Sequence, residues 1–339
     1  MAQQSTVAAT QPVEKTNFII TLLRGAGQVM FQGNAWTGLF FLIGIFWGSY
    51  ATGNVLVAWG SVLGLVTSTV TGYILGLPHT DGKQGLWGFN GILVGCAFPT
   101  FLGSTLWMWL ALIMCAAMTT WVRTGLNNVM APWKVNSFTF TFVLSTWIFL
   151  LAARVMKGIP VELSVPALPI ELFKTADGLH FVDLVVWWLK GVAQVFLVDN
   201  WVTGALFLIG LACSNWWSVL WAAFASAVSL FVILVLRGPA TDIAEGLYGF
   251  SAVLTGIALG SIFYKPSWRS ALWAFVGVIA TVFVQAWLNL CLEPLGLPAL
   301  TGPFCITTWL FLLPLLKFKS KEDIDHSKWD HRKFKIKNS

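Results

Sequence analysis

Charged side chains are scarce in this chain of 339 residues, since Asp, Glu, Lys and Arg make up only 10% of it while hydrophobic residues make up 57%. Soluble globular proteins carry roughly 25% charged residues. The shortage excludes an ordinary water-soluble domain and predicts an integral membrane protein. Apolar runs long enough to cross about 30 Å of hydrocarbon as helices occur in both halves. The alternating pattern of a membrane β-barrel does not occur, so we expect an all-α fold.

Residues that usually carry out chemistry are also few. The four histidines fall in predicted loops or in the C-terminal tail, and neither a phosphate-binding Gly-rich loop nor a His-Glu-x-x-His pair occurs. The five cysteines show no CxxC spacing, and we interpret them all as small core residues. We therefore predict no enzyme activity, no catalytic residues, no metal site and no cofactor.

The two ends of the chain indicate its orientation. Residues 1–15 are polar and lack the apolar core of a signal peptide. The tail 317–339 carries eight Lys or Arg residues against four Asp or Glu. Basic residues beside a span mark the cytoplasmic side, so we expect both termini in the cytoplasm of a bacterial inner-membrane protein that crosses the membrane many times. The net charge of +6 indicates contact with anionic lipid, and we expect no nucleic-acid partner.

The second half of the chain repeats the first. Residues 85–89 read GLWGF and residues 246–250 read GLYGF, 161 positions later (246 − 85 = 161). Two further matched blocks keep the same order. We place the first repeat at 16–155, a linker at 156–179 and the second repeat at 180–316. The expected crossings are 17–33, 36–52, 54–76, 104–122 and 136–155, followed by 180–198, 201–217, 218–236, 269–291 and 300–316.

An odd number of crossings per repeat has a topological consequence. With five crossings in each copy, the second copy must enter from the opposite side of the membrane, which gives an inverted repeat. Proteins built in this way place their working site where the two copies meet. We therefore expect the site at the repeat interface.

One segment of each repeat is too short to cross the membrane. Each begins with an acid and, three residues later, a second polar residue that suits a capping box, Asp81 with Gln84 and Asp242 with Glu245. The apolar run that follows ends after about a dozen residues, or roughly 18 Å of helix. We expect one re-entrant half-helix per repeat, and hence a pore that covers the exposed helix ends. The alternative is that the glycines in these segments serve only close helix packing.

Polar residues recur at matching positions inside the predicted spans. Gln28 matches Gln194, and Thr139 matches Thr301. For a single residue of this kind, a structural hydrogen bond within or between helices is the simpler explanation. A buried polar group costs free energy unless it finds a partner or water, and recurrence in both copies favours a polar lining.

The block that contains Thr301 carries a recognisable signature. Residues 297–304 read LPALTGPF, which resembles the Leu-Pro-x-x-Thr-x-Pro-Phe signature of bacterial and animal urea transporters. The Gln blocks and the Gly-aromatic-Gly-Phe blocks also look like that family, so the likeness covers 17–316. The first copy departs from the signature, with Asn136 and Thr141 in place of the two prolines. It keeps Thr139.

The resemblance implies a homotrimer with one pore per protomer, in which phenylalanines form a slot for planar urea and oxygen atoms line one side. Carried over by position, Phe89 and Phe250 would form the ends of the slot, and Thr139 and Thr301 would be its central hydroxyls. The remaining lining residues would be the flanking amides Gln28 and Gln194 and the apolar wall of Phe31, Leu93, Leu197 and Leu254.

Passive transport of urea is the function that these features favour. Urea is flat and uncharged, and a row of oxygen atoms can replace its hydration water stepwise. Ionisable residues such as Arg24, Arg123 and Glu293 fall at span ends, whereas an ion-coupled carrier normally places one at mid-membrane. The alternatives are a channel or carrier for ammonia, water or a short amide, and a membrane scaffold without a pore.

Overall fold

A computed structural model describes residues 17–162 and 180–316. These residues form helices, turns and a single β-bridge, between Leu102 and Val161, so the chain is all-α as expected. The bridge joins the end of one helix to the first part of the predicted linker. The N-terminal segment 1–15, residues 163–179 of the linker and the tail 317–339 lie outside the described residues, as do the predictions made for them.

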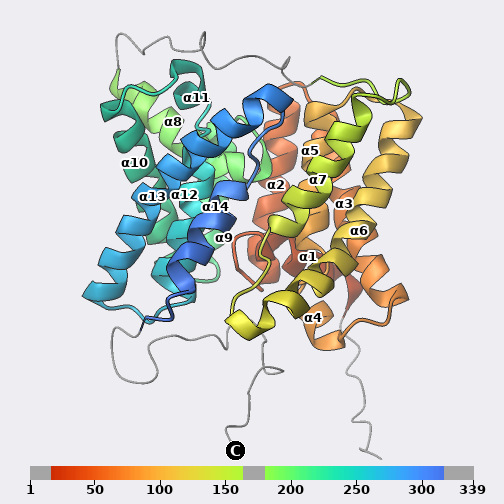
Figure 1. Cartoon of the computed structure of the whole chain (residues 1–339), viewed down its shortest axis with the longest axis horizontal. Helices are drawn as coiled ribbons and strands as arrows, with labels where there is room; N and C mark the ends of the chain where they lie inside the picture. The colour runs from red at the N-terminus through yellow and green to blue at the C-terminus, as the bar shows by residue number, and fades with distance from the viewer. Residues whose placement is uncertain (1–16, 163–179, 317–339) are drawn as a thin grey trace, which may run out of the picture.

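Elements of similar length follow one another in the same order in both halves (Figure 1). The first half contains α1 (Phe18–Gln28), α2 (Ala35–Ala51), α3 (Val55–Ile74), α4 (His79–Lys83), α5 (Phe89–Phe101), α6 (Leu106–Met130), η1 (Ala131–Trp133) and α7 (Phe140–Ala153). The second contains α8 (Phe181–Ala193), η3 (Gln194–Phe196), α9 (Trp201–Ala212), α10 (Trp216–Val235), α11 (Ala240–Ala244), α12 (Gly249–Ile257), η4 (Ala258–Ile262), α13 (Trp268–Leu292), η5 (Glu293–Leu295) and α14 (Gly302–Leu312).

Several of these helices are candidate membrane spans. Four described segments are long and apolar enough to cross a membrane, namely Val55–Ile74, Leu106–Trp133, Trp216–Val235 and Trp268–Leu295. The pair Phe181–Phe196 and Trp201–Ala212, bent by 71°, adds a fifth if it counts as one span. The other expected crossings coincide with shorter helices. Length and composition therefore support a multi-pass membrane protein.

Several of the expected spans were too long, among them the first span of each repeat. The helix predicted at 17–33 ends at Gln28, and the one predicted at 180–198 ends at Ala193 and continues only as a short 3-10 turn. The reason is that Phe31 and Leu197 have φ angles of 65° and 59°. A right-handed helix cannot include such residues, because its φ angles are negative.

The capping-box prediction was wrong. Asp81 and Asp242 lie inside the short helices α4 and α11, which begin after Pro78 and Pro239, and neither helix has a side-chain cap. An acid inside the first turn of a short helix can also be followed by a polar residue three positions later, so the sequence spacing does not distinguish it from an N-cap residue. The short helices lie at opposite ends of the bundle, α4 at the bottom and α11 at the top of Figure 1.

The half-length helices α5 and α12 begin after a tight turn. Gly85 and Gly246 in these turns have φ angles of 81° and 73°, which favour glycine. An added Cβ would collide with the backbone of α1 at Gly85 and with the backbone of α8 at Gly246. Helix α5 contains Pro99 and ends at Phe101, while α12 continues into the π-helical turn η4. Both are completely buried over most of their length.

Matching residues of the two halves make reciprocal hydrogen bonds between α2 and α9. The Thr37 hydroxyl donates to the Gly210 carbonyl at 2.7 Å, and the Thr203 hydroxyl donates to the Gly44 carbonyl at 2.8 Å. The start of α2 thus meets the end of α9, and the start of α9 meets a later part of α2, so these two helices are antiparallel.

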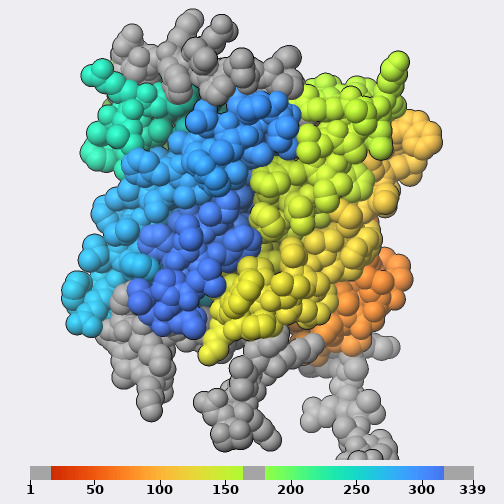
Figure 2. Space-filling model, viewed as in Figure 1, coloured from red at the N-terminus to blue at the C-terminus, as the bar shows by residue number. Residues whose placement is uncertain are grey.

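A second reciprocal pair joins α7 and α14. Trp147 Nε1 donates to the carbonyl of Pro298 at 2.8 Å, and Trp309 Nε1 donates to the carbonyl of Asn136 at 2.7 Å. Because the acceptor is a backbone oxygen, Asn in place of the signature proline leaves this contact intact. Figure 2 shows the two segments side by side, α6 and α7 in yellow to lime and α13 and α14 in blue.

Candidate functional site

Thr139 and Thr301 are in direct contact. They precede α7 and α14, and each side chain is almost completely buried. Their hydroxyl oxygens lie 2.6 Å apart, and Thr139 Oγ1 also lies 3.4 Å from Cys305 Sγ. The structure therefore brings together the two hydroxyls that sequence reasoning placed at the centre of the site. It adds the thiol of Cys305, which the sequence analysis did not single out.

The hydrogen-bond chemistry of this pair follows from its geometry. Each hydroxyl has one proton and two lone pairs, and one proton is used in the mutual bond. The pair therefore retains acceptor lone pairs and at most one free proton. A neutral solute with several N–H groups matches this arrangement, because it has donors to offer.

The two glutamines make equivalent contacts. Gln28 Nε2 donates to the carbonyl of Gln84, and Gln194 Nε2 donates to the carbonyl of Glu245, both at 2.9 Å. Each bond ties the end of one helix to the turn before a half-length helix. Since the nitrogen side of each amide is turned toward a carbonyl, its oxygen is the atom that remains to accept a bond from a ligand.

The predicted slot residues lie on the half-length helices. Phe89 and Phe250 are in the first turns of α5 and α12, and Leu93 and Leu254 follow four residues later on the same faces. All four are buried. Helix α5 packs against α1 and α7, and α12 packs against α8 and α14. Each half-length helix thus contacts one helix with a predicted Gln at its end and one helix that begins directly after a predicted Thr.

The wall residues Phe31 and Leu197 have different surroundings. Phe31 belongs to a cluster of four phenylalanines with ring centroids between 5.5 and 6.3 Å apart, the others being Phe138, Phe263 and Phe304. The position that matches each of them in the opposite repeat holds, in the same order, Leu197, Leu300, Leu102 and Phe142. The cluster borders the hydroxyl pair because Phe138 directly precedes Thr139. The cluster is therefore fully aromatic, whereas the matching set of positions is mainly aliphatic.

Arg123 is a site neighbour that the sequence analysis treated only as the end of a span. Its Nη1 lies 3.1 Å from Asp81 Oδ2, and its guanidinium carbon lies 5.9 Å from the centre of the Phe89 ring. The matching residue in the second half is Gln285, which donates to Asn289 at 2.9 Å. The sequence signal that could have indicated this pair is the presence of an arginine and an aspartate within the largely apolar first half of the chain.

The acids near the start of α12 are in a different electrostatic setting. Burial raises the pKa of Asp242 to about 6, assisted by the charges of Glu245 and Glu293 and opposed by a hydrogen bond from Thr241. Burial also raises the pKa of Glu245, where the charge of Asp199 adds to the effect and Lys190 opposes it. Asp81, which matches Asp242 in the first half, instead has the Arg123 guanidinium beside it.

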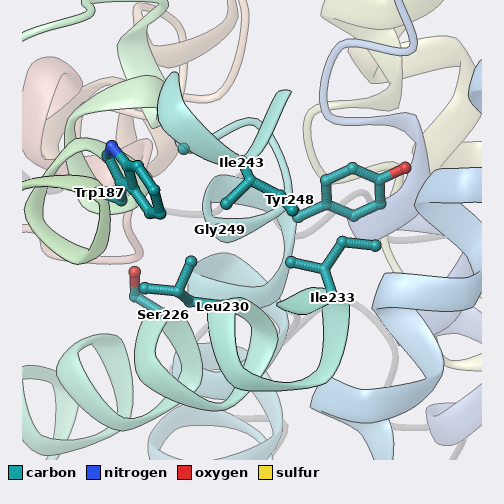
Figure 3. A pocket seen from close by; sticks show the side chains of 8 residues that line it. Trp187, Ser226, Leu230, Ile233, Ile243, Tyr248 and Gly249 are labelled. Carbon is teal, nitrogen blue, oxygen red and sulfur yellow. The ribbon is translucent and has the colours of Figure 1, made fainter. Parts of the chain in front are cut away.

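A small apolar pocket lies behind the start of α12 (Figure 3). Its lining includes Trp187, Leu230, Ile233 and Tyr248, and the rings of Trp187 and Tyr248 lie on opposite sides of Ile243 in this view. None of the predicted site residues lines it. It is therefore separate from the Gln, Thr and Phe positions described above.

The interpretation of all five cysteines as core residues was wrong in part. Cys96, Cys115 and Cys305 are buried, but Cys213 and Cys291 are exposed, so their interpretation as core residues was wrong. Apolar sequence surroundings do not separate core positions from lipid-facing ones, since both are apolar. Over 17–162 and 180–316, the structure contains no group of three or more His, Cys, Asp or Glu side chains that could hold a metal ion.

Comparison with known proteins covers this whole region. The sequence model of the family described as "Urea transporter" matches residues 19–315. Urea transporter 1 of sheep (Ovis aries) is 29% identical over 300 residues, which are 87% of this chain and 77% of the sheep protein. Urea transporter 1 of rat (Rattus norvegicus) is 30% identical over 300 residues, with the same two shares. The match includes both halves and all the predicted site residues, and the chain therefore belongs to the urea transporter family.

Proposed function

We propose that this chain conducts urea passively across a membrane, through a narrow pore lined by Gln, Thr and backbone oxygens and by Phe side chains. The observation that carries the proposal is the contact of Thr139 with Thr301 at 2.6 Å, in a chain of the urea transporter family. Two neutral hydroxyls buried together between matching helices suit a neutral ligand. They offer no fixed charge to an ion.

The proposed architecture is a pair of inverted repeats, at 16–155 and 180–316, each with five crossings and one re-entrant half-helix. Reciprocal hydrogen bonds between α2 and α9 support a two-fold relation between the halves. Because these helices are antiparallel, the axis of that relation runs across them. For helices that cross the bilayer, such an axis lies in the membrane plane.

The proposed path places each pair of residues symmetrically. Phe89 and Phe250 form the two ends of the slot, Gln28 and Gln194 accept hydrogen bonds beside them, and the Thr pair lies at the centre. Phe31, Leu93, Leu197 and Leu254 complete the apolar wall. Urea exchanges water for one oxygen after another, so that binding stays shallow at each step. A hydrated ion would lose its water without any opposite charge to replace it.

The proposed setting is the cell membrane of a bacterium, with both termini in the cytoplasm and three protomers per assembly. Large apolar side chains on the surface support burial in lipid or against a neighbouring protomer, including Trp36 at 66% exposure and Trp216 at 69%. Mass spectrometry of the protein released from lipid nanodiscs should give the mass of a trimer.

A flux experiment tests the function. The purified protein is placed in liposomes loaded with urea, and efflux is followed by light scattering after rapid dilution. We expect urea efflux well above that of protein-free liposomes and independent of proton or sodium gradients. Passage of ammonia, water or acetamide without urea would establish the alternative solute. If none of these solutes passed through the membrane, the alternative of a scaffold without a pore would be supported.

A further inference from the structure

We propose that Arg123, held by Asp81, is a positioning residue that fixes the Phe89 ring in the wall of the pore. The second half has a glutamine at the matching position. This inference rests on the proposed function, in which Phe89 forms one end of the urea slot. It extends that function by naming the residue that sets the width of the slot at this end.

The geometry places one guanidinium between two partners. Arg123 projects from α6, and its side chain is only 8% exposed. Its Nη1 lies 3.1 Å from Asp81 Oδ2 on α4, and its guanidinium carbon lies 5.9 Å from the centre of the Phe89 ring on α5. Three elements therefore meet at this one side chain.

Both contacts act on the same group. A planar guanidinium can bond a carboxylate through its edge and attract the face of an aromatic ring, whereas the compact ammonium of lysine does not combine the two in the same way. Such an attraction to a ring strengthens when water is excluded, as it is here. The carboxylate holds the cation, and the cation holds the ring, so rotation of Phe89 would weaken a favourable contact.

The second half shows what is left when the arginine is replaced. Gln285 lies at the position that matches Arg123, and its amide nitrogen bonds Asn289 on the same helix. Two arginines of the described residues lie over aromatic rings, Arg123 over Phe89 and Arg269 over Trp268, and neither ring is that of Phe250. At the position that would hold the Phe250 ring in the same way, the side chain is thus a neutral amide that is bonded to Asn289. The Phe89 end should therefore be the stricter of the two in solute size.

The first experiment compares fluxes of two solutes in liposomes. Arg123→Gln gives the first half the residue that the second half already has, and Arg123→Lys keeps the charge. The measured quantity is the ratio of urea flux to N,N′-dimethylurea flux. We expect Arg123→Gln to lower this ratio about three- to tenfold and Arg123→Lys to lower it less. Arg269→Gln, which removes the exposed arginine–tryptophan contact, is the matched control and should leave the ratio unchanged.

A ratio separates positioning from general stability. If Arg123 served only the fold, Arg123→Gln would lower both fluxes in proportion, as fewer folded molecules would be present. That result would overturn the inference while leaving urea conduction established. Asp81→Asn should shift the ratio in the same direction as Arg123→Gln, since it releases the guanidinium.

A second measurement does not depend on transport. With 4-fluorophenylalanine in place of Phe89, the fluorine resonance reports the surroundings of the ring in detergent micelles. We expect Arg123→Gln to move and broaden this resonance and Arg269→Gln to leave it unchanged. An unchanged resonance would refute the positioning role. If the wild-type protein moved no urea, the proposed function would fail, and this spectrum would still decide whether Arg123 fixes the ring.

Discussion

The hydroxyl of Thr139 lies within hydrogen-bond distance of the hydroxyl of Thr301, 162 positions away in the chain. Each residue stands directly before a helix, Thr139 before α7 and Thr301 before α14. The bond therefore ties together the beginnings of two matching helices at an almost completely buried point. Removal of either hydroxyl deprives the other of this hydrogen bond, which makes the pair suitable for a mutational test.

Replacement of these threonines by valine should show strong coupling. We expect Thr139→Val to destabilise the fold by about 1–3 kcal/mol, because it leaves the Thr301 hydroxyl without this bond. Thr301→Val should cost less, since Thr139 keeps its contact with Cys305 Sγ. The double variant should cost less than the two single ones together. Unfolding titrations in mixed micelles measure these values, and strict additivity would contradict the coupling. Urea flux should fall in all three variants.

The two glutamines should contribute equally. Gln28→Leu and Gln194→Leu each remove a 2.9 Å bond to a carbonyl that precedes a half-length helix. We expect similar losses of stability, about 1–2 kcal/mol each, and similar losses of urea flux per folded molecule. The comparison uses thermal unfolding and liposome efflux on the same preparations. A loss of flux in one variant only would show that the two amides do not have matching roles.

The close approach of α3 to α5 predicts a severe effect at one glycine. A Cβ added at Gly64 would collide with the carbonyl of Gly91. Because backbone atoms cannot move aside as a side chain does, we expect Gly64→Ala to destabilise the protein by about 2 kcal/mol or more. Gly125→Ala on α6 is the control, since no atom lies within 4 Å of its added Cβ. It should stabilise the helix by about 0.5–1 kcal/mol, and similar outcomes for the two variants would refute the packing argument.

The raised pKa of Asp242 predicts that stability depends on pH. The folded protein holds this proton up to a pH of about 6, whereas an ordinary Asp releases it near 3.8. The unfolded chain therefore binds fewer protons over this interval, and stability falls as the pH rises through it. Asp242→Asn should remove this contribution. We expect it to raise the unfolding temperature at pH 7.5 and to change it little at pH 4. An equal change at both values would point to another cause.

Much of this site could be predicted from the internal repeat. Matching positions with the same uncommon residue type, such as Gln28 with Gln194, make equivalent hydrogen bonds, and the threonine pair meets directly. The repeat was informative because each position occurs twice. Where the copies differ, as at Asn136 and Pro298, the sequence did not reveal that both serve through a backbone carbonyl.

Other parts depended on information that the sequence pattern does not contain. Arg123 and Asp81 are 42 positions apart on different helices, and their contact depends on how each helix is rotated about its own axis. In an apolar chain this rotation leaves little trace, because the core and the lipid-facing surface are both hydrophobic. The left-handed backbone at Phe31 was equally hidden, since a bulky aromatic residue rarely adopts it.

The reciprocal bonds of Thr37 and Thr203 resemble those across the interface of a symmetric homodimer, yet both lie in one polypeptide. In a homodimer a single gene encodes both sides, so every substitution occurs twice. When both halves belong to one polypeptide, matching positions are encoded separately and can differ. Position 31 can remain Phe while position 197 is Leu, and Arg123 can be retained where its counterpart has become Gln285. Natural selection can therefore change a position in one half of the chain independently of the matching position in the other half.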